Sequence, residues 1–184
     1  MLSQKKILGI DPGTNIMGFG VIELIDQKIN LVEFDVLILD KIKDPHLKLK
    51  KIYKKTTLLI DTYNPNELAI EAPFFGKNIQ SMLKLGRAQG ASMIAGINKN
   101  IPIFEYAPKK IKLAVTGRGQ ASKEQVAAML MHMLQIKQKP KHLDSTDGLA
   151  VAVCHALQRN ISQNQKAKSK SWSEFIKKNP KRII

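Results

Sequence analysis

The sequence predicts an α/β domain in which a five-stranded mixed sheet is flanked by helices. Three β-rich segments come first, at residues 6–12, 16–24 and 29–39, and short turns separate them. Two later apolar segments of strand length, 68–72 and 101–107, alternate with segments of helical composition. Strands joined by short turns pair antiparallel and strands joined through a helix are parallel, so we expect a mixed sheet.

The leading strands are predicted from apolar runs that end at turns. Residues 6–12, KILGIDP, stop at a Pro-Gly turn, which is typical of a buried strand. Segments 16–24 and 29–39 are rich in β-forming residues, and a short polar link around Asp26 joins them. We therefore expect these three segments to be consecutive antiparallel strands.

The helices that follow show distinct local signals. Residues 45–63 place apolar side chains among many lysines, which predicts an amphipathic helix with a basic outer face. Residues 79–99 are helical in composition and rich in small residues, as in a closely packed helix. Pro108 can open a short helix, and the sequence SKEQ from Ser122 matches a capping box at the start of the next one.

The last predicted helix begins near Leu143 or Asp144 and ends at about Arg159. The residues beyond it are mostly polar and basic, with few apolar side chains to bury. We therefore expect one folded domain, residues 1–159, followed by a flexible basic tail, residues 160–184.

The charge of the chain points to a polyanionic partner. The 184 residues include 30 Lys and Arg against 15 Asp and Glu, a formal net charge of +15. From Arg159 to the end there are eight basic residues and one acid, and the rest of the chain is basic as well. Nucleic acid is the first candidate partner and an anionic membrane surface the second.

Other features favour a cytoplasmic protein without a membrane span. No apolar run reaches the roughly 18 residues expected of a transmembrane helix. The N-terminal residues lack the apolar stretch of a signal peptide, and the single cysteine, Cys154, cannot form an internal disulfide.

Two acidic residues interrupt apolar strands. Asp11 ends the first strand in GIDPGT, where Pro12 and Gly13 turn the chain and leave the carboxylate at the strand end. The alternative is that Asp11 simply opens a β-turn. Glu71 lies in ELAIEAPFF, and an acid inside an apolar run is costly unless it is paired or bound to a metal. The alternative is that strand alternation points Glu71 outward.

Asp144 and Asp147 are three residues apart at the start of the last predicted helix. This spacing places both carboxylates on one helical face. The alternative is that both serve the helix, because acids favour the first turn and Asp144 can cap its N-terminus.

Taken together, the four acids form a ligand set for a hard divalent cation. Carboxylate oxygens suit Mg²⁺ or Mn²⁺, and a nuclease that uses two such ions needs several carboxylates. Zinc is not favoured, since Cys154 lies on an apolar helix face and His132 and His155 lie inside predicted helices. The predicted catalytic metal ligands are Asp11, Glu71, Asp144 and Asp147.

Five ordered blocks surround these acids. They are GIDPGT (9–14), AIEAPFFGKN (69–78), LKLGRAQG (83–90), VTGRGQASKEQV (115–126) and LDSTDGLAVAVCHAL (143–157). The set extends over roughly residues 6–158 and resembles the RuvC family, the bacterial crossover junction endodeoxyribonucleases.

The resemblance implies a ribonuclease-H-like nuclease domain at residues 1–159. It implies cleavage of two opposed strands of a Holliday junction, a four-way DNA junction formed in recombination and repair. The family pattern makes the four acids ligands of Mg²⁺, for which Mn²⁺ can substitute. A homodimer is also implied, with the branch-migration proteins RuvA and RuvB as partners.

The resemblance further implies a set of DNA-contacting residues. Phe74 matches an aromatic residue that stacks on an unpaired base near the crossover, and Phe75 is an adjacent candidate. Basic residues in or near the blocks are candidates to contact phosphates, although for any single one a solvated charge is favoured over an essential contact. They are Lys77, Lys84, Arg87, Lys112, Arg118 and Lys123.

Other classes of protein remain open on the sequence. An actin-like ATPase or sugar kinase shares the early strand and Asp-Gly turn, but 184 residues leave little room for its second nucleotide-binding half. A non-catalytic DNA-binding protein on the same fold would lack one or more of the four acids. A ribonuclease-H-like nuclease that acts on RNA–DNA hybrids, or as a recombinase, is a related alternative.

Overall fold

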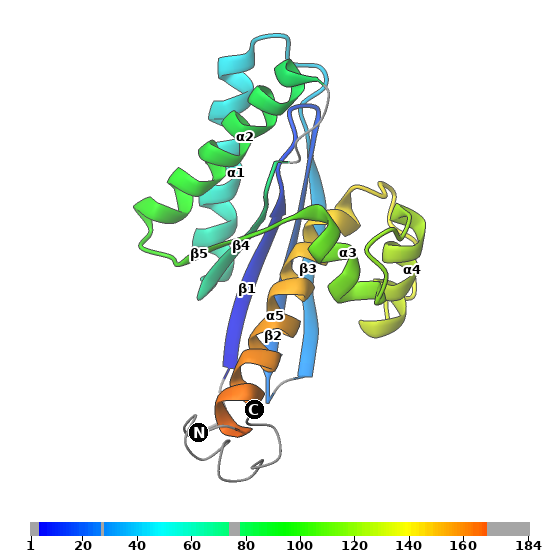
Figure 1. The fold of residues 1–184 in the computed structure, drawn as a ribbon. Helices are drawn as coiled ribbons and strands as arrows, with labels where there is room; N and C mark the ends of the chain where they lie inside the picture. The colour runs from blue at the N-terminus through cyan, green and yellow to red at the C-terminus, as the bar shows by residue number, and fades with distance from the viewer. Residues whose placement is uncertain (1–3, 27, 74–77, 169–184) are drawn as a thin grey trace, which may run out of the picture.

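The computed structural model describes residues 4–26, 28–73 and 78–168, with side chains as far as Arg159. Within these residues five strands form one mixed sheet in the order β3-β2-β1-β4-β5 (Figure 1). The predicted fold class is therefore confirmed.

The sheet combines an antiparallel unit with two parallel strands. β1 (Gln4–Asp11), β2 (Ile16–Ile25) and β3 (Lys28–Ile38) pair antiparallel in sequence order. β4 (Glu67–Glu71) lies parallel to β1, and β5 (Ile103–Tyr106) lies parallel to β4. β1 and β4 are thus interior strands, and their carboxyl ends lie at the same edge of the sheet.

Helices cover both faces of this sheet (Figure 1). α1 (Pro45–Tyr63) and α2 (Ile79–Asn98) pack together on one face. α5 (Ser145–Lys168) crosses the other face, with α3 (Pro108–Thr116) and α4 (Lys123–Met133) beside it. The buried apolar residues accordingly form two clusters, one under α5 and one under α1 and α2.

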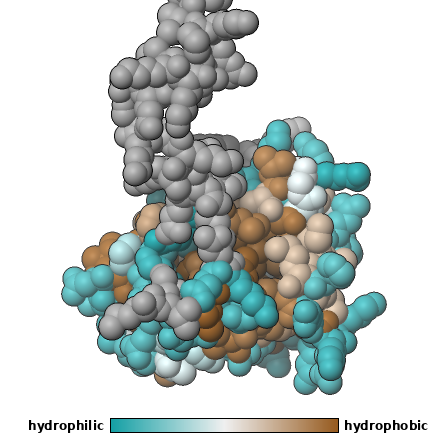
Figure 2. All heavy atoms as spheres, turned by 90° about the horizontal axis from the view of Figure 1, so that it is seen from below, coloured by the Kyte–Doolittle hydropathy of each residue, from teal (hydrophilic) through white to brown (hydrophobic). Residues whose placement is uncertain are grey.

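The surface is mixed in hydropathy. Seen from below, hydrophobic atoms occupy the middle of the face and hydrophilic atoms its rim (Figure 2). In the described part of the chain, no helix combines the length and the hydropathy that crossing a membrane requires.

The helix boundaries match the prediction except at the end of α5. Ser122 and Gln125 form the expected capping box of α4, and Pro108 lies in the first turn of α3. α5, however, continues to Lys168, beyond the predicted end at Arg159. The added segment, NISQNQKAK, contains no proline or glycine and includes the good helix formers Gln, Lys and Ala, so its polarity does not prevent a helix.

α5 packs directly against the backbone of the sheet because both surfaces carry glycine. A Cβ added at Gly18 would overlap the carbonyl oxygen of Asp144, and one added at Gly148 would overlap the Cα of Phe19. A side chain at either position would push the helix away from the sheet. The start of α5, which carries Asp147, is thereby held close to the strand ends.

Candidate active site

Asp11 and Glu71 lie side by side at the carboxyl edge of the sheet. Asp11 ends β1 and Glu71 ends β4, and the strand register pairs Ile10 with Ile70, the residue before each acid. Both acids are partly buried, and with Leu85 of α2 they line a cleft of about 300 Å³. Their expected position at the strand ends is confirmed, and Glu71 faces the cleft.

Asp144 and Asp147 reach this edge from α5. Asp144 directly precedes the helix and Asp147 lies in its first turn. The side chain of Asp147 is 14% exposed and that of Asp144 is 38% exposed, so Asp147 is the more buried of the two. Lys123, the first residue of α4, donates to Asp144 Oδ1 over 2.9 Å and to Asp147 Oδ2 over 2.6 Å. One ammonium group therefore bridges the pair.

The pKa of three of these acids is raised, by burial first and by neighbouring carboxylates second. Burial, followed by the charges of Asp147 and Asp144, raises the pKa of Asp11 to about 7, while Lys123 opposes the rise. Burial and the charges of Asp11 and Asp147 raise the pKa of Glu71 to about 8. Burial also raises the pKa of Asp147. The four acids thus form one electrostatic unit that nearby cations do not fully neutralise.

The donor set fits a hard divalent cation in its chemistry. Four carboxylates supply the oxygen ligands that Mg²⁺ and Mn²⁺ prefer, and a cation would relieve their mutual repulsion. Among the described residues, no three His, Cys, Asp or Glu side chains converge closely enough to enclose an ion. Lys123 lies instead between two of the acids, where hydrogen bonds to Asp147 and Asp144 raise its pKa although burial opposes this.

Metal-free protein is expected to lose stability as the pH rises from about 4 to about 8. In this range the unfolded chain releases protons that folded Asp11 and Glu71 retain, so the free energy of unfolding falls. Glu71→Gln should flatten this fall and raise the free energy of unfolding by about 1–3 kcal/mol at pH 8. Thermal unfolding in EDTA measures both effects. Parallel pH curves for the parent and Glu71→Gln would show that Glu71 is not the titrating group.

Two of the predicted DNA-contacting residues line a basic groove beside the acids. Lys84 and Arg87 of α2 face a groove of about 920 Å³ that is also lined by Lys43, Lys48 and Asp144. Because Asp144 forms part of its wall, the groove adjoins the acid cluster.

The other predicted DNA-contacting residues lie in different parts of the structure. The charge of Lys112 opposes the rise in the pKa of Glu71, which places this lysine near the site. Arg118 is exposed in the loop after α3, and Lys123 faces the two aspartates. Three further predicted residues lie outside the described part of the chain, namely Phe74, Phe75 and Lys77.

Two lysines have contacts that the sequence did not reveal. Lys48 Nζ donates to the carbonyl oxygen of Thr14 over 2.7 Å and to Asn15 Oδ1 over 3.1 Å, which ties α1 to the turn after Asp11. The basic face predicted for residues 45–63 was the available signal for it. Lys123 was expected to contact phosphate, and nothing in its spacing pointed to aspartates 21 and 24 residues away.

The fold and the acid cluster define a ribonuclease-H-like domain with an acidic site at the sheet edge. The solved structure of Thermus thermophilus RuvC in complex with Holliday junction substrate is similar, with a TM-score of 0.79 at 28% identity. The similarity covers 86% of this chain and 96% of that chain. A yeast mitochondrial Holliday junction resolvase shares the fold, with a TM-score of 0.60 at 14% identity over 86% of this chain and 83% of that chain.

Sequence comparison gives the family. Residues 7–155 match the model of the crossover junction endodeoxyribonuclease RuvC. The protein of this name from Christiangramia forsetii is 57% identical over 182 residues, which is 98% of this chain and 94% of the relative. That from Bacteroides fragilis is 52% identical over 184 residues, 99% of this chain and 97% of the relative. The chain belongs to the RuvC family, and its class of activity is the hydrolysis of phosphodiester bonds in DNA.

Proposed function

We propose that this protein is a Mg²⁺-dependent endonuclease that resolves Holliday junctions by paired nicks in opposed strands. The observation that carries the proposal is the gathering of four acids at the ends of β1 and β4 and at the start of α5, with the pKa values of Asp11 and Glu71 raised by burial and by neighbouring carboxylates. Such an arrangement is costly unless a cation uses it. The proposed catalytic residues and metal ligands are Asp11, Glu71, Asp144 and Asp147.

The acids hold the cation in this proposal, and the surrounding basic residues hold the DNA. When bound, Mg²⁺ supplies positive charge that polarises the scissile phosphate, and Mn²⁺ is expected to substitute as a similar hard ion. Hydrolysis breaks the P–O3′ bond, so the products carry a 5′-phosphate and a 3′-hydroxyl. Lys123 orients the two aspartates that it bridges, and Lys112 adds positive charge beside Glu71.

The basic groove gives the proposed path of one DNA strand. Lys84 and Arg87 would contact its phosphates, and the groove would lead the backbone past Asp144 into the acid cluster. Arg118 and Lys77 are proposed to add phosphate contacts, and Phe74 to stack on a base near the crossover.

Cutting two opposed strands calls for two active sites. A homodimer with two-fold symmetry supplies such a pair, and we include it in the proposal. RuvA and RuvB remain the expected partners, in the cytoplasm. Residues 1–159 would form the nuclease domain, and residues 160–184 an added basic segment.

A synthetic four-way junction tests this function. With Mg²⁺ we expect symmetric nicks in two opposed strands, and with EDTA we expect intact strands. A linear duplex and an RNA–DNA hybrid of the same sequence serve as controls. Faster cleavage of the hybrid than of the junction would favour a different ribonuclease-H-like nuclease, and ATP binding without DNA binding would favour the actin-like class.

The basic C-terminal segment is proposed to add sequence-independent DNA affinity. Five basic residues and one acid follow Lys168, so a variant that ends there loses positive charge but keeps α5. We expect about tenfold weaker junction binding at low salt and a smaller dependence of binding on salt. Fluorescence anisotropy at roughly 50 to 200 mM salt measures both effects. In a plot of the logarithm of the binding constant against the logarithm of the salt concentration, each phosphate contact contributes about 0.9 to the slope.

A second variant separates charge from chain length in this experiment. Lys177→Gln with Lys178→Gln keeps the full length and removes two positive charges. Its affinity should lie between those of the parent and the shortened variant. If all three proteins share one affinity and one salt slope, the segment has no part in binding.

A further inference from the structure

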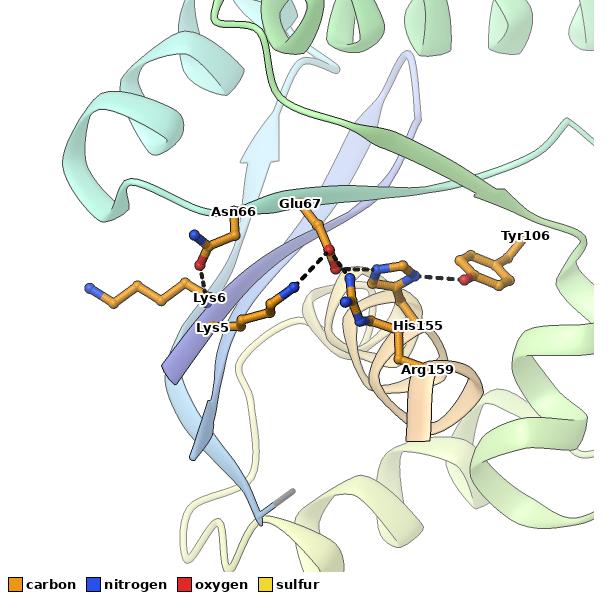
Figure 3. A network of polar contacts seen from close by, with 7 residues as sticks. All are labelled: Lys5, Lys6, Asn66, Glu67, Tyr106, His155 and Arg159. Atoms are coloured by element: carbon orange, nitrogen blue, oxygen red, sulfur yellow. Dashed lines mark hydrogen bonds and ion pairs between the residues drawn. The ribbon is translucent and has the colours of Figure 1, made fainter. Parts of the chain in front are cut away.

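A second polar cluster lies at the opposite end of β4 from Glu71. Glu67, the first residue of β4, is 6% exposed. Its carboxylate accepts a hydrogen bond from His155 Nε2 over 2.8 Å and pairs with Arg159, and both partners lie on α5. Lys5 of β1 approaches the same carboxylate to 3.6 Å (Figure 3). A buried acid is thus bound to the helix that also carries Asp147, one of the proposed catalytic residues.

Hydrogen bonding through this cluster has a defined direction. Burial and the charge of Lys5 lower the pKa of His155 to about 4, so its ring is neutral. An ionised Glu67 can only accept, so Nε2 carries the proton and donates to it. Nδ1 then accepts from the hydroxyl of Tyr106 over 2.6 Å, and burial raises the pKa of Tyr106 to about 12, which keeps that hydroxyl protonated. The hydrogen bonds from Tyr106 to His155 and from His155 to Glu67 therefore all run in one direction, with each donor matched to an acceptor.

Tyr106 connects this chain back to the catalytic end of β4. The register of β4 with β5 places Tyr106 opposite Glu71, and the N–H of Ala72 donates to the carbonyl oxygen of Tyr106 over 2.9 Å. Glu67, Ala69 and Glu71 share one face of β4, because side chains alternate along a strand. Ala69 belongs to the buried cluster under α5, so this shared face meets the helix.

The facing rows of β4 and α5 match in length. From Glu67 to Glu71 the strand advances about 13 Å, at roughly 3.3 Å per residue. From Asp147 to His155 the helix advances about 12 Å, at roughly 1.5 Å per residue, and the two residues lie about 80° apart on the same broad side of the helix. When His155 is bonded to Glu67, the helix therefore carries Asp147 to the level of Glu71. The glycine contacts at Gly18 and Gly148 hold the start of the helix, and the buried bond between His155 and Glu67 adds a polar contact two turns further along it.

We propose that Glu67 and His155 form a positioning pair that fixes α5 along β4 and thereby holds Asp147 beside Glu71. Arg159 and Lys5 balance the charge of Glu67. The pair acts through the helix and not by contact with DNA. The inference rests on the proposed function for the role of the acids at the far end, but the positioning itself needs neither metal nor DNA.

Hydrogen–deuterium exchange of the full-length, metal-free protein tests the positioning. In His155→Leu we expect amide exchange in the first turn of α5, residues 145–149, to accelerate about tenfold, although this turn lies two helical turns away. His155→Gln keeps an N–H donor for Glu67 and should restore slow exchange. Val153→Ala removes buried volume from the same helix and is the control for a general loss of stability. Exchange in His155→Leu no faster than in Val153→Ala would overturn the proposal.

Metal affinity gives a second readout on the same proteins. Isothermal titration with Mn²⁺ should show about tenfold weaker binding for His155→Leu than for Val153→Ala, with junction binding in EDTA unchanged. If the parent protein binds no Mn²⁺, the proposed function fails, while the exchange experiment still decides the positioning pair.

A milder variant covers the case in which His155→Leu does not fold. Glu67→Gln keeps the shape of the side chain but replaces the charge-assisted bond from His155 by a weaker neutral one. It should shift exchange in the first turn of α5 in the same direction by a smaller factor. If exchange in that turn stays at the parent rate, the proposal is overturned.

Discussion

Replacing Asp11 by asparagine is expected to lower the rate of junction cleavage about a thousandfold while junction binding stays within about twofold. The amide keeps the shape of the carboxylate but lacks the charge that holds a cation. Single-turnover cleavage in Mg²⁺ measures the first effect, and gel-shift titration in EDTA measures the second. Undiminished cleavage by Asp11→Asn would remove this residue from the catalytic set.

Stability separates this loss of catalysis from simple unfolding. Burial and two neighbouring aspartates raise the pKa of Asp11 to about 7, so removing its charge relieves repulsion. The melting temperature of Asp11→Asn at pH 8 should therefore equal or exceed that of the parent. Asp61→Asn is the matched control, since Asp61 is an exposed acid of α1 whose ion pair is with Lys99. Its cleavage rate should equal that of the parent.

Gly148→Ala is expected to lower the free energy of unfolding by about 2–4 kcal/mol and to lower cleavage strongly in the molecules that remain folded. The new methyl group would overlap backbone atoms of Gly18 and Phe19, which cannot move without disturbing β2. The helix must therefore shift outward, and Asp147, the preceding residue, moves with it. Urea unfolding and single-turnover cleavage measure the two effects.

A glycine in open surroundings provides the comparison for this variant. Gly90 of α2 has no atom within 4 Å of an added Cβ. Gly90→Ala should raise stability by up to about 1 kcal/mol, because alanine is the better helix former, and should leave cleavage unchanged. Equal stability of Gly148→Ala and Gly90→Ala would mean that α5 does not rest on the sheet backbone as described.

Most of the fold could be predicted because its signals are local. Apolar runs bounded by turns marked the five strands within a few residues, and the capping box from Ser122 marked the start of α4. The predicted end of α5 was wrong because polar residues such as those of 160–168 are compatible with a helix and with a disordered segment alike. Helix propensity alone therefore does not determine where α5 ends.

The acid cluster was predictable in part. Glu71 drew attention because a charge inside an apolar run needs an explanation, and the spacing of Asp144 and Asp147 suggested one face. The raised pKa values of Asp11 and Glu71 come from burial and from neighbouring carboxylates, which depend on strand register and helix placement that no local pattern contains. The link from Glu67 to His155 spans 88 residues and was not predicted for the same reason.

The outer position of β3 has a consequence for assembly. β3 is the longer of the two edge strands, and the unpaired backbone groups of a long edge strand can pair with a strand of another molecule. Exposed Glu33 and Asp35 and an irregularity opposite Val21 and Ile22 protect it, since like charges and a bulge both disfavour edge-to-edge association. The charged and irregular edge therefore disfavours aggregation of the sheet along β3.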